Sequence, residues 1–258
     1  MSDITSPEEF FGHRLGADQK IARWDKIVEY FNKLQSESPR IKVIDMGPTT
    51  EGNPFLAVFV SSEENLGNLE RLQEINKKIA DPDELGIEAI GPLIQEGKAV
   101  VIQSMSLHAT EIGGTQMSSE LAYDLITRED PEAQRIRDEV ISIMVPSFNP
   151  DGQIMVTDWY NEWLGTDYEG CSTPFLYHKY CGHDNNRDAF MLNTVESNYM
   201  AELMFKDWPP QAYQDHHHMG SYGARLYVSP YSDPIHPHGD PLVWRELQWY
   251  GSHMAYKL

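Results

Sequence analysis

Hydrophobic residues recur along this chain with two different spacings, one typical of helices and the other typical of strands. Between residues 16 and 36 they lie three or four positions apart, at Ile21, Trp24, Ile27, Val28, Phe31 and Leu34. This spacing places them on one face of a helix. Further helices are predicted over residues 63–80, 115–128, 190–206 and 241–258.

Short apolar segments between these helices predict strands. They lie at residues 41–46, 55–60, 99–105, 140–145, 212–217 and 224–228. The first two flank a turn-forming segment, so we expect a hairpin at the edge of a sheet. The third and fourth are continuous apolar runs, which are typical of buried strands. Strands that alternate with helices in this way favour an α/β sandwich in one domain over residues 1–258.

One long segment has no regular spacing. Residues 153–188 are irregular and rich in Tyr, Trp, Gly and His. A loop of this length is uncommon inside a compact domain unless it builds a binding site or a lid. We therefore expect this segment to contribute to function.

The composition excludes several classes of protein. The 258 residues include 40 Asp and Glu against 20 Lys and Arg, a formal net charge of −20, and 40% are hydrophobic. This apolar content suffices for a folded core, so the chain is not an acidic disordered segment. Nucleic acid is not an expected partner, because its phosphates attract a basic face that this sequence lacks.

Signals for membrane insertion and export are absent from the sequence as written. No segment is apolar enough for a transmembrane helix, and the start, MSDITSPEEF, does not form a secretory signal. Cys171 and Cys181 are the only cysteines, and they neither require a disulfide nor exclude one.

Three polar clusters carry potential chemistry, and the first follows the strand at 99–105. His108 and Glu111 are three positions apart. An imidazole nitrogen and a carboxylate oxygen suit Zn²⁺ if the residues between them form a turn. Taken alone, such a pair more often belongs to a solvated loop.

The second cluster is a run of histidines at the end of the strand 212–217. Side chains alternate between the two faces of a strand, so His216, His217 and His218 cannot all face one ion. Either His217 points one way alone, or His216 and His218 point the other way together. A histidine-bearing surface loop is the third alternative, although the ends of strands commonly build sites in α/β proteins.

The third cluster lies in residues 184–188. The planar guanidinium of Arg187, preceded by Asn186, can hold a carboxylate through two parallel hydrogen bonds. Alternatively, Arg187 forms a surface ion pair with Asp184 or Asp188.

Taken in order, these clusters resemble the motifs of the zinc metallocarboxypeptidases, the carboxypeptidase A-like peptidases. The resemblance rests on His108-x-x-Glu111, Asn149-Pro150-Asp151-Gly152, Asn186-Arg187, and Asp215-x-His217 followed by Met219-Gly220. It extends from the strand pair near residue 41 to the end of the chain. It implies a three-layer α/β/α domain with a mixed, mostly parallel central sheet.

The resemblance also implies a metal site. His108, Glu111 and His217 would hold one Zn²⁺ per chain, with a water in the fourth position to attack the peptide carbonyl. Asp215 would support His217 as an outer hydrogen-bond partner.

The same resemblance implies a substrate. Asn186 and Arg187 would bind the free carboxylate of a peptide or protein C-terminus, whose last peptide bond is hydrolysed. The segment 149–152 would be scaffold beside the site. Family members suggest a secreted or periplasmic location.

One departure from the family concerns the oxyanion. The family places an arginine between the second and third motifs, but residues 153–185 contain none, and Lys179 is their only cation. Trp159 or Asn161 lies near the expected place. Loss of such a donor typically costs about a hundredfold or more in rate.

A second departure concerns the general base. The family carries a glutamate base and a substrate-covering tyrosine well after the third zinc ligand, whereas here the only later glutamate is Glu246, in a helical pattern. That apolar pattern continues to Leu258 without a stop signal. We therefore expect an N-terminal portion of a larger protein, incomplete before its C-terminal strands, which binds zinc with little or no peptidase activity.

Two other functions stay open. A zinc deacylase of small N-acyl amino acids shares this fold and would also need Arg187. A non-catalytic module that binds peptide C-termini would account for the missing oxyanion arginine. Motifs of thermolysin-like proteases, nucleobase deaminases, serine hydrolases and nucleotide-binding loops do not occur.

Overall fold

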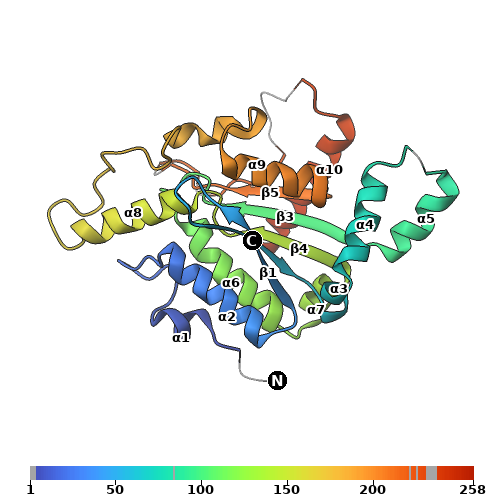
Figure 1. The fold of residues 1–258 in the computed structure, drawn as a ribbon, viewed down its shortest axis with the longest axis horizontal. Coiled ribbons are helices and arrows are strands. Elements are labelled where there is room, and N and C mark those ends of the chain that lie inside the picture. Colours follow the sequence, from blue (N-terminus) through green and yellow to red (C-terminus); the bar gives the residue numbers. More distant parts are fainter. Residues whose placement is uncertain (1–3, 84, 221, 225, 231–236) are drawn as a thin grey trace. The chain divides into compact units, whose positions relative to one another are not determined.

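A five-stranded sheet organises the first of two units in the chain (Figure 1). The structure is a computed structural model. The residues that it describes are 4–83, 85–220, 222–224, 226–230 and 237–258. The two units are Met1–His217, which contains the sheet, and His218–Leu258.

The sheet has the order β1-β2-β4-β3-β5. Its strands are β1 (Ile41–Pro48), β2 (Pro54–Val60), β3 (Ala99–Met105), β4 (Val140–Val145) and β5 (Ala212–His216). β2 is antiparallel to both β1 and β4, whereas β3 is parallel to both β4 and β5. Four strands therefore run one way and β2 runs against them, which confirms the mixed, mostly parallel sheet and the hairpin at its edge.

Helices cover both faces of this sheet. They are α4 (Leu69–Ala80) and α9 (Val195–Glu202) on one face, and α2 (Trp24–Glu37) and α6 (Gly113–Thr127) on the other. The alternation of side chains along β2 requires both layers, since Phe55 and Leu56 are buried in opposite clusters. Burial of each such large side chain stabilises the fold by about 1.5–3 kcal/mol. The three-layer α/β/α architecture is confirmed.

Shorter elements complete the chain. In the first unit they are α1 (Pro7–Phe11), α3 (Glu63–Gly67), α5 (Ile87–Glu96), α7 (Pro131–Glu139), α8 (Pro150–Trp163), the 3₁₀ helix η1 (Gly182–Phe190) and the π-helical turn η2 (Leu203–Asp207). The second unit contains α10 (Pro241–Lys257), as predicted. None of the helices in the described ranges has the length and hydropathy of a membrane span.

Several predicted helix boundaries are wrong for local reasons. The helix predicted from residue 16 begins at Trp24, because the chain forms a turn before it in which Gln19 has a φ of 62°. The helix predicted over 63–80 is divided at Asn68, whose φ of −118° and ψ of 22° are not helical. The helix predicted from residue 190 begins at Val195, after the capping hydroxyl of Thr194.

Two helices and one strand were also misjudged. α5 was not predicted because it contains Gly91 and Pro92, which are poor helix formers, and α7 because it buries only Ala133 and Arg137. The strand predicted at 224–228 is wrong for residues 224 and 226–228, which have no regular structure; residue 225 lies outside the described residues.

The Asn149–Gly152 motif begins a helix, so the irregular segment predicted at 153–188 is wrong in its first part. The Asn149 side chain caps α8 by accepting a hydrogen bond from the Gly152 N–H at 2.9 Å. Pro150 occupies the first turn of α8, where a backbone N–H has no helical partner. These two residues are start signals for a helix, and the segment that remains irregular begins after Trp163.

Asp151 connects α8 to the first hairpin. Its buried carboxylate accepts hydrogen bonds from the Glu51 N–H at 2.9 Å and from the Asn53 side chain at 2.7 Å. Both donors lie in the turn between β1 and β2, so this turn is fixed against the start of α8.

Gly152 is required by a close approach of the backbone. A Cβ atom at this position would overlap the Tyr177 carbonyl oxygen and the Ala109 side chain. The same carbonyl accepts a hydrogen bond from Asn149 Nδ2 at 2.9 Å. The start of α8 therefore holds the irregular segment next to the loop that follows β3.

We predict that Gly152→Ala lowers the free energy of unfolding by about 1–3 kcal/mol, because the new methyl group has no room. Denaturant unfolding measures this change. Gly67→Ala is the matched control, since a Cβ there meets nothing within 4 Å. Equal stability of the two variants would contradict the packing described at Gly152.

Candidate metal centre

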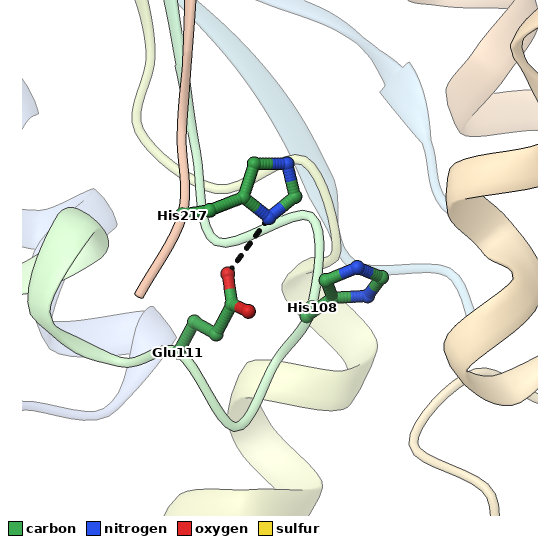
Figure 2. Close-up of side chains that lie close together, drawn as sticks. All are labelled: His108, Glu111 and His217. Carbon is green, nitrogen blue, oxygen red and sulfur yellow. Dashed lines mark hydrogen bonds and ion pairs between the residues drawn. The ribbon is translucent and has the colours of Figure 1, made fainter. Parts of the chain in front are cut away.

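The predicted metal ligands lie at one edge of the sheet, beyond the ends of two neighbouring strands. His108 and Glu111 lie in the turn between β3 and α6, and His217 directly follows β5 (Figure 2). β3 and β5 are parallel, with Met105 opposite His216. Parallel neighbours end at the same edge, so the two segments leave the sheet side by side.

The three side chains converge on one point. One ligand atom from each of His108, Glu111 and His217 lies within 4.8 Å of the other two. Glu111 Oε2 is 2.9 Å from His217 Nδ1, and a dashed line marks this contact in Figure 2. Two imidazoles and a carboxylate with space for a further ligand are the donors of catalytic zinc sites. The residues present therefore fit a zinc ion.

Asp215 fixes the orientation of the His217 ring. His217 Nε2 lies 2.7 Å from Asp215 Oδ2, while the other oxygen of that carboxylate accepts a hydrogen bond from Ser104 at 2.9 Å. Because Nε2 is bonded to Asp215, Nδ1 is the nitrogen that faces Glu111. The Asp215 hydrogen bond raises the pKa of His217 to about 9, so a metal ion here competes with a proton.

His108 provides the buried side of the group. Its side chain is 4% exposed, and this burial lowers its pKa, which favours the neutral imidazole that a metal binds. Its Nε2 lies 3.4 Å from Asn186 Nδ2. Its ring also stacks on His183, with 3.8 Å between the ring centroids.

The turn between His108 and Glu111 is fixed by its backbone and by Ser106. The Glu111 N–H donates to the His108 carbonyl at 2.9 Å. The buried Ser106 hydroxyl donates to the Glu111 carbonyl at 2.8 Å and accepts from the Thr115 N–H at 3.1 Å. Glu111 therefore leaves the turn at the base of α6, pointing toward His217.

The histidine run divides as strand alternation requires. His217 faces Glu111, whereas His216 is directed elsewhere, with its Nε2 buried and unbonded among the described residues. His218 belongs to the second unit. Of the alternatives left open by the sequence, the structure places His217 alone with the first cluster.

The Asn186–Arg187 pair lies on η1, next to His108. Within the described residues Arg187 forms no ion pair with Asp184 or Asp188; its hydrogen bond is to the Asn186 carbonyl, at 3.5 Å. The guanidinium is exposed on a chain whose formal net charge is −20. It is therefore available to an external anion.

Asp188 is occupied in supporting η1. Burial favours a raised pKa, but hydrogen bonds from the Thr194 N–H and hydroxyl and from the Asn193 N–H outweigh it and hold the pKa of Asp188 at about 2. The carboxylate is thus ionised and bonded to its own turn, which leaves Arg187 unneutralised.

The sequence analysis missed two residues at the site, Tyr177 and His183. Tyr177 Oη lies 2.7 Å from His183 Nδ1 and 3.4 Å from His108 Nδ1. The sequence indicated them only through the many aromatic residues and histidines in the segment 153–188. Because this segment has no regular spacing, no single position in it could be chosen.

Two of the three candidates for the missing oxyanion arginine, Trp159 and Lys179, are bonded to other residues. The Trp159 indole N–H donates to the Cys171 carbonyl at 3.1 Å, and Lys179 pairs with Glu51 at 2.7 Å. Asn161 is exposed on α8.

Cys171 and Cys181 are both free thiols.

One solved structure shares this fold, and a second is similar to part of the chain. Thrombin-activatable fibrinolysis inhibitor aligns with 100% of this chain and 60% of its own, at 14% identity and a TM-score of 0.56. Carboxypeptidase A from Helicoverpa armigera aligns over 83% of this chain and 52% of its own, at 15% identity and a TM-score of 0.49. The chain thus spans between about half and three fifths of the length of these two structures.

Comparison with models of protein families identifies the family of this chain, whereas a search of the curated proteins finds no match. The model of the zinc carboxypeptidase family matches residues 27–254, which include the whole group of candidate ligands and Arg187. This match covers most of the chain, and the architecture agrees with it. The chain belongs to the zinc carboxypeptidase family, peptidase family M14.

Proposed function

We propose that this protein is metallocarboxypeptidase-like: it binds one Zn²⁺ at His108, Glu111 and His217, and its substrate is the C-terminal peptide bond of a peptide or protein. Because the only glutamate after His217 is Glu246, on α10, we expect little or no cleavage by these 258 residues. The observation that carries the proposal is the convergence of these three ligand atoms within 4.8 Å. Membership of the zinc carboxypeptidase family supports the choice of metal.

Two of the three proposed ligands are held by nearby side chains. Ser106 fixes the turn that carries Glu111, and Asp215 holds the Nδ1 of His217 toward the site. When bound, zinc lowers the pKa of a water and polarises the carbonyl that is attacked. The protein contributes a fixed set of donors with space for the substrate.

Arg187 selects the substrate in this proposal. Its exposed guanidinium, unpaired with carboxylates in the described residues, binds the terminal carboxylate through two parallel hydrogen bonds. Asn186, which reaches His108, lies between Arg187 and the metal ligands along the chain. A carboxylate on Arg187 therefore orients the last residue of a peptide next to the metal group.

Tyr177 is the neutral donor that we assign to the carbonyl oxygen of the scissile bond. Its hydroxyl lies 3.4 Å from His108 Nδ1 and is fixed by His183. Burial raises the pKa of Tyr177, which keeps the phenol protonated and able to donate. A neutral hydroxyl stabilises a developing oxyanion less than a guanidinium does, so we expect slower turnover than an arginine would allow.

The metal assignment predicts about one zinc ion per chain. His217→Ala should lose most of this zinc because one of three ligands is removed. Metal analysis after dialysis measures the content, with His13→Ala as the control, since His13 lies outside the site. The assignment fails if the wild-type protein holds less than about a tenth of an equivalent.

Asp215→Ala is predicted to weaken zinc binding by about ten- to a hundredfold without abolishing it, because the ring of His217 loses its orienting partner. Competition with a chelator gives the affinity. The control is Asp184→Asn, which changes an exposed carboxylate on η1. Unchanged affinity in Asp215→Ala would show that His217 needs no such support.

Arg187→Ala is predicted to weaken binding of a peptide with a free C-terminus at least tenfold, in line with about 1.5–3 kcal/mol for hydrogen bonds to a charged group. Calorimetric titration of the zinc-loaded protein measures this. A peptide with an amidated C-terminus is the control and should bind wild type and variant equally weakly.

The same titrations separate the alternatives. Binding and hydrolysis of N-acyl amino acids, with no binding of peptides, would replace the peptidase assignment by a deacylase. Because little or no cleavage is expected of these residues in either case, binding of peptide C-termini through Arg187 without cleavage does not separate the peptidase from a non-catalytic module, whereas cleavage of the bound peptide would exclude the module. An Arg187→Ala variant that binds free C-termini as tightly as wild type would contradict carboxylate binding by Arg187, which all three proposed functions share.

A further inference from the structure

A cavity lies beside the metal centre, on the side of Glu111. Its volume is about 780 Å³, and Thr110 and Ile112, the two neighbours of Glu111, contribute to its wall. The rest of the wall comes from the segment 15–21, from α6, from α8 and from residues 170–173. The cavity therefore adjoins the metal ligands without containing them.

Aromatic side chains of α8 form one wall. Trp159, Tyr160 and Trp163 line the cavity, and the two indoles meet edge to face with 5.5 Å between their centroids. Phe175 and Tyr168 pack against these indoles from behind, at 5.7 and 5.5 Å. These contacts hold the wall in place before any ligand binds.

The irregular segment is tied to this wall by polar contacts. Trp159 donates to the Cys171 carbonyl at 3.1 Å. The Glu169 carboxylate accepts hydrogen bonds from Tyr160 at 3.4 Å, from Gln19 at 3.3 Å and from the Gly165 N–H at 2.9 Å. The cavity is thus bordered by three separate parts of the chain, which these hydrogen bonds join to one another.

Acidic side chains also line the cavity. Asp18 and Glu120 line the cavity, against a single basic residue, Lys20. Burial and the nearby Asp124 carboxylate raise the pKa of Glu120 and outweigh the charge of Arg14, which lowers it. Aromatic faces and carboxylates together favour a cation.

The position of the cavity relative to Arg187 gives the direction of a bound chain. Asn186 and Arg187 lie on the His108 side of the metal group, whereas the cavity lies on the Glu111 side. A peptide whose terminal carboxylate is on Arg187 and whose last peptide bond is at the ligands continues toward the cavity. Its upstream residues then reach the aromatic wall.

We propose that this cavity binds a lysine or arginine side chain of the substrate, in one of the residues that precede the C-terminal residue. This proposal rests on the proposed carboxypeptidase function. The cation lies over the indole faces of Trp159 and Trp163 and pairs with Glu120 or Asp18. The enzyme is therefore selective for basic sequences upstream of the bond that it cleaves.

Peptide binding tests this selectivity without relying on turnover. The probes are N-acetylated alanine hexapeptides with a free C-terminus, in which one lysine, or norleucine as its neutral analogue, is moved through the upstream positions. At one or two positions lysine should bind at least about fivefold more tightly than norleucine. The doubly substituted Asp18→Asn, Glu120→Gln protein should lose this difference, whereas the control Glu70→Gln should keep it.

A second measurement locates the bound side chain. Cys171 lines the cavity and is exposed, whereas Cys181 does not line it. The lysine peptide should slow alkylation of Cys171 by iodoacetamide at least severalfold and leave Cys181 unaffected. Because it follows the wild-type protein, this readout does not depend on the folding of a variant. Equal binding of lysine and norleucine peptides at every position, or no protection of Cys171, would overturn the proposal.

The two proposals fail in different ways. If Arg187→Ala leaves peptide affinity unchanged while the lysine preference and the Cys171 protection persist, the carboxylate anchor is wrong and the cavity is a cation site. If Arg187→Ala weakens binding but no lysine preference exists, the anchor holds and the cavity proposal is overturned.

Discussion

The parallel pairing of β3 with β5 is the constraint on which the candidate site depends. Ser104 lies opposite Asp215 in this pair, and the Ser104 hydroxyl bonds the Asp215 carboxylate at 2.9 Å. Asp215 in turn holds His217, which faces Glu111 at 2.9 Å. The register of two strands is therefore transmitted through Ser104 and Asp215 to the candidate metal ligands His217 and Glu111. A shift of β5 by one residue would turn His217 to the other face of the sheet.

A second set of buried polar contacts holds the long segment after α8 against that edge. Asn149 binds the Tyr177 carbonyl, and the buried His178 and Glu196 side chains lie 3.3 Å apart. Glu196 also accepts the Thr50 N–H at 2.7 Å. Each buried group would be costly if left unpaired, so these contacts specify one path for a segment that has few core residues of its own. That path brings Tyr177 to the candidate metal centre.

Much of the fold and the metal group could be predicted from sequence, because both follow from short-range rules. Apolar spacing identified β3 and β4 with their observed bounds, and strand alternation separated His217 from His216. The contacts of Tyr177 and His183 could not be predicted, since they depend on how an irregular segment folds back over the sheet. The start of α8 was missed because Asn149 and Pro150 serve turns and helix starts alike. The absence of an ion pair between Arg187 and Asp188 could not be predicted either, because it depends on the hydrogen bonds that Asp188 accepts from Asn193 and Thr194.

The most direct test of this account is the position of zinc in crystals of the metal-loaded protein, measured by anomalous scattering at the zinc absorption edge. The account predicts one strong peak per chain within bonding distance of His108, Glu111 and His217, with His217 bound through Nδ1 and Asp215 still on Nε2. A peak at His216 or His218 instead, or zinc bound only at scattered surface carboxylates, would contradict it.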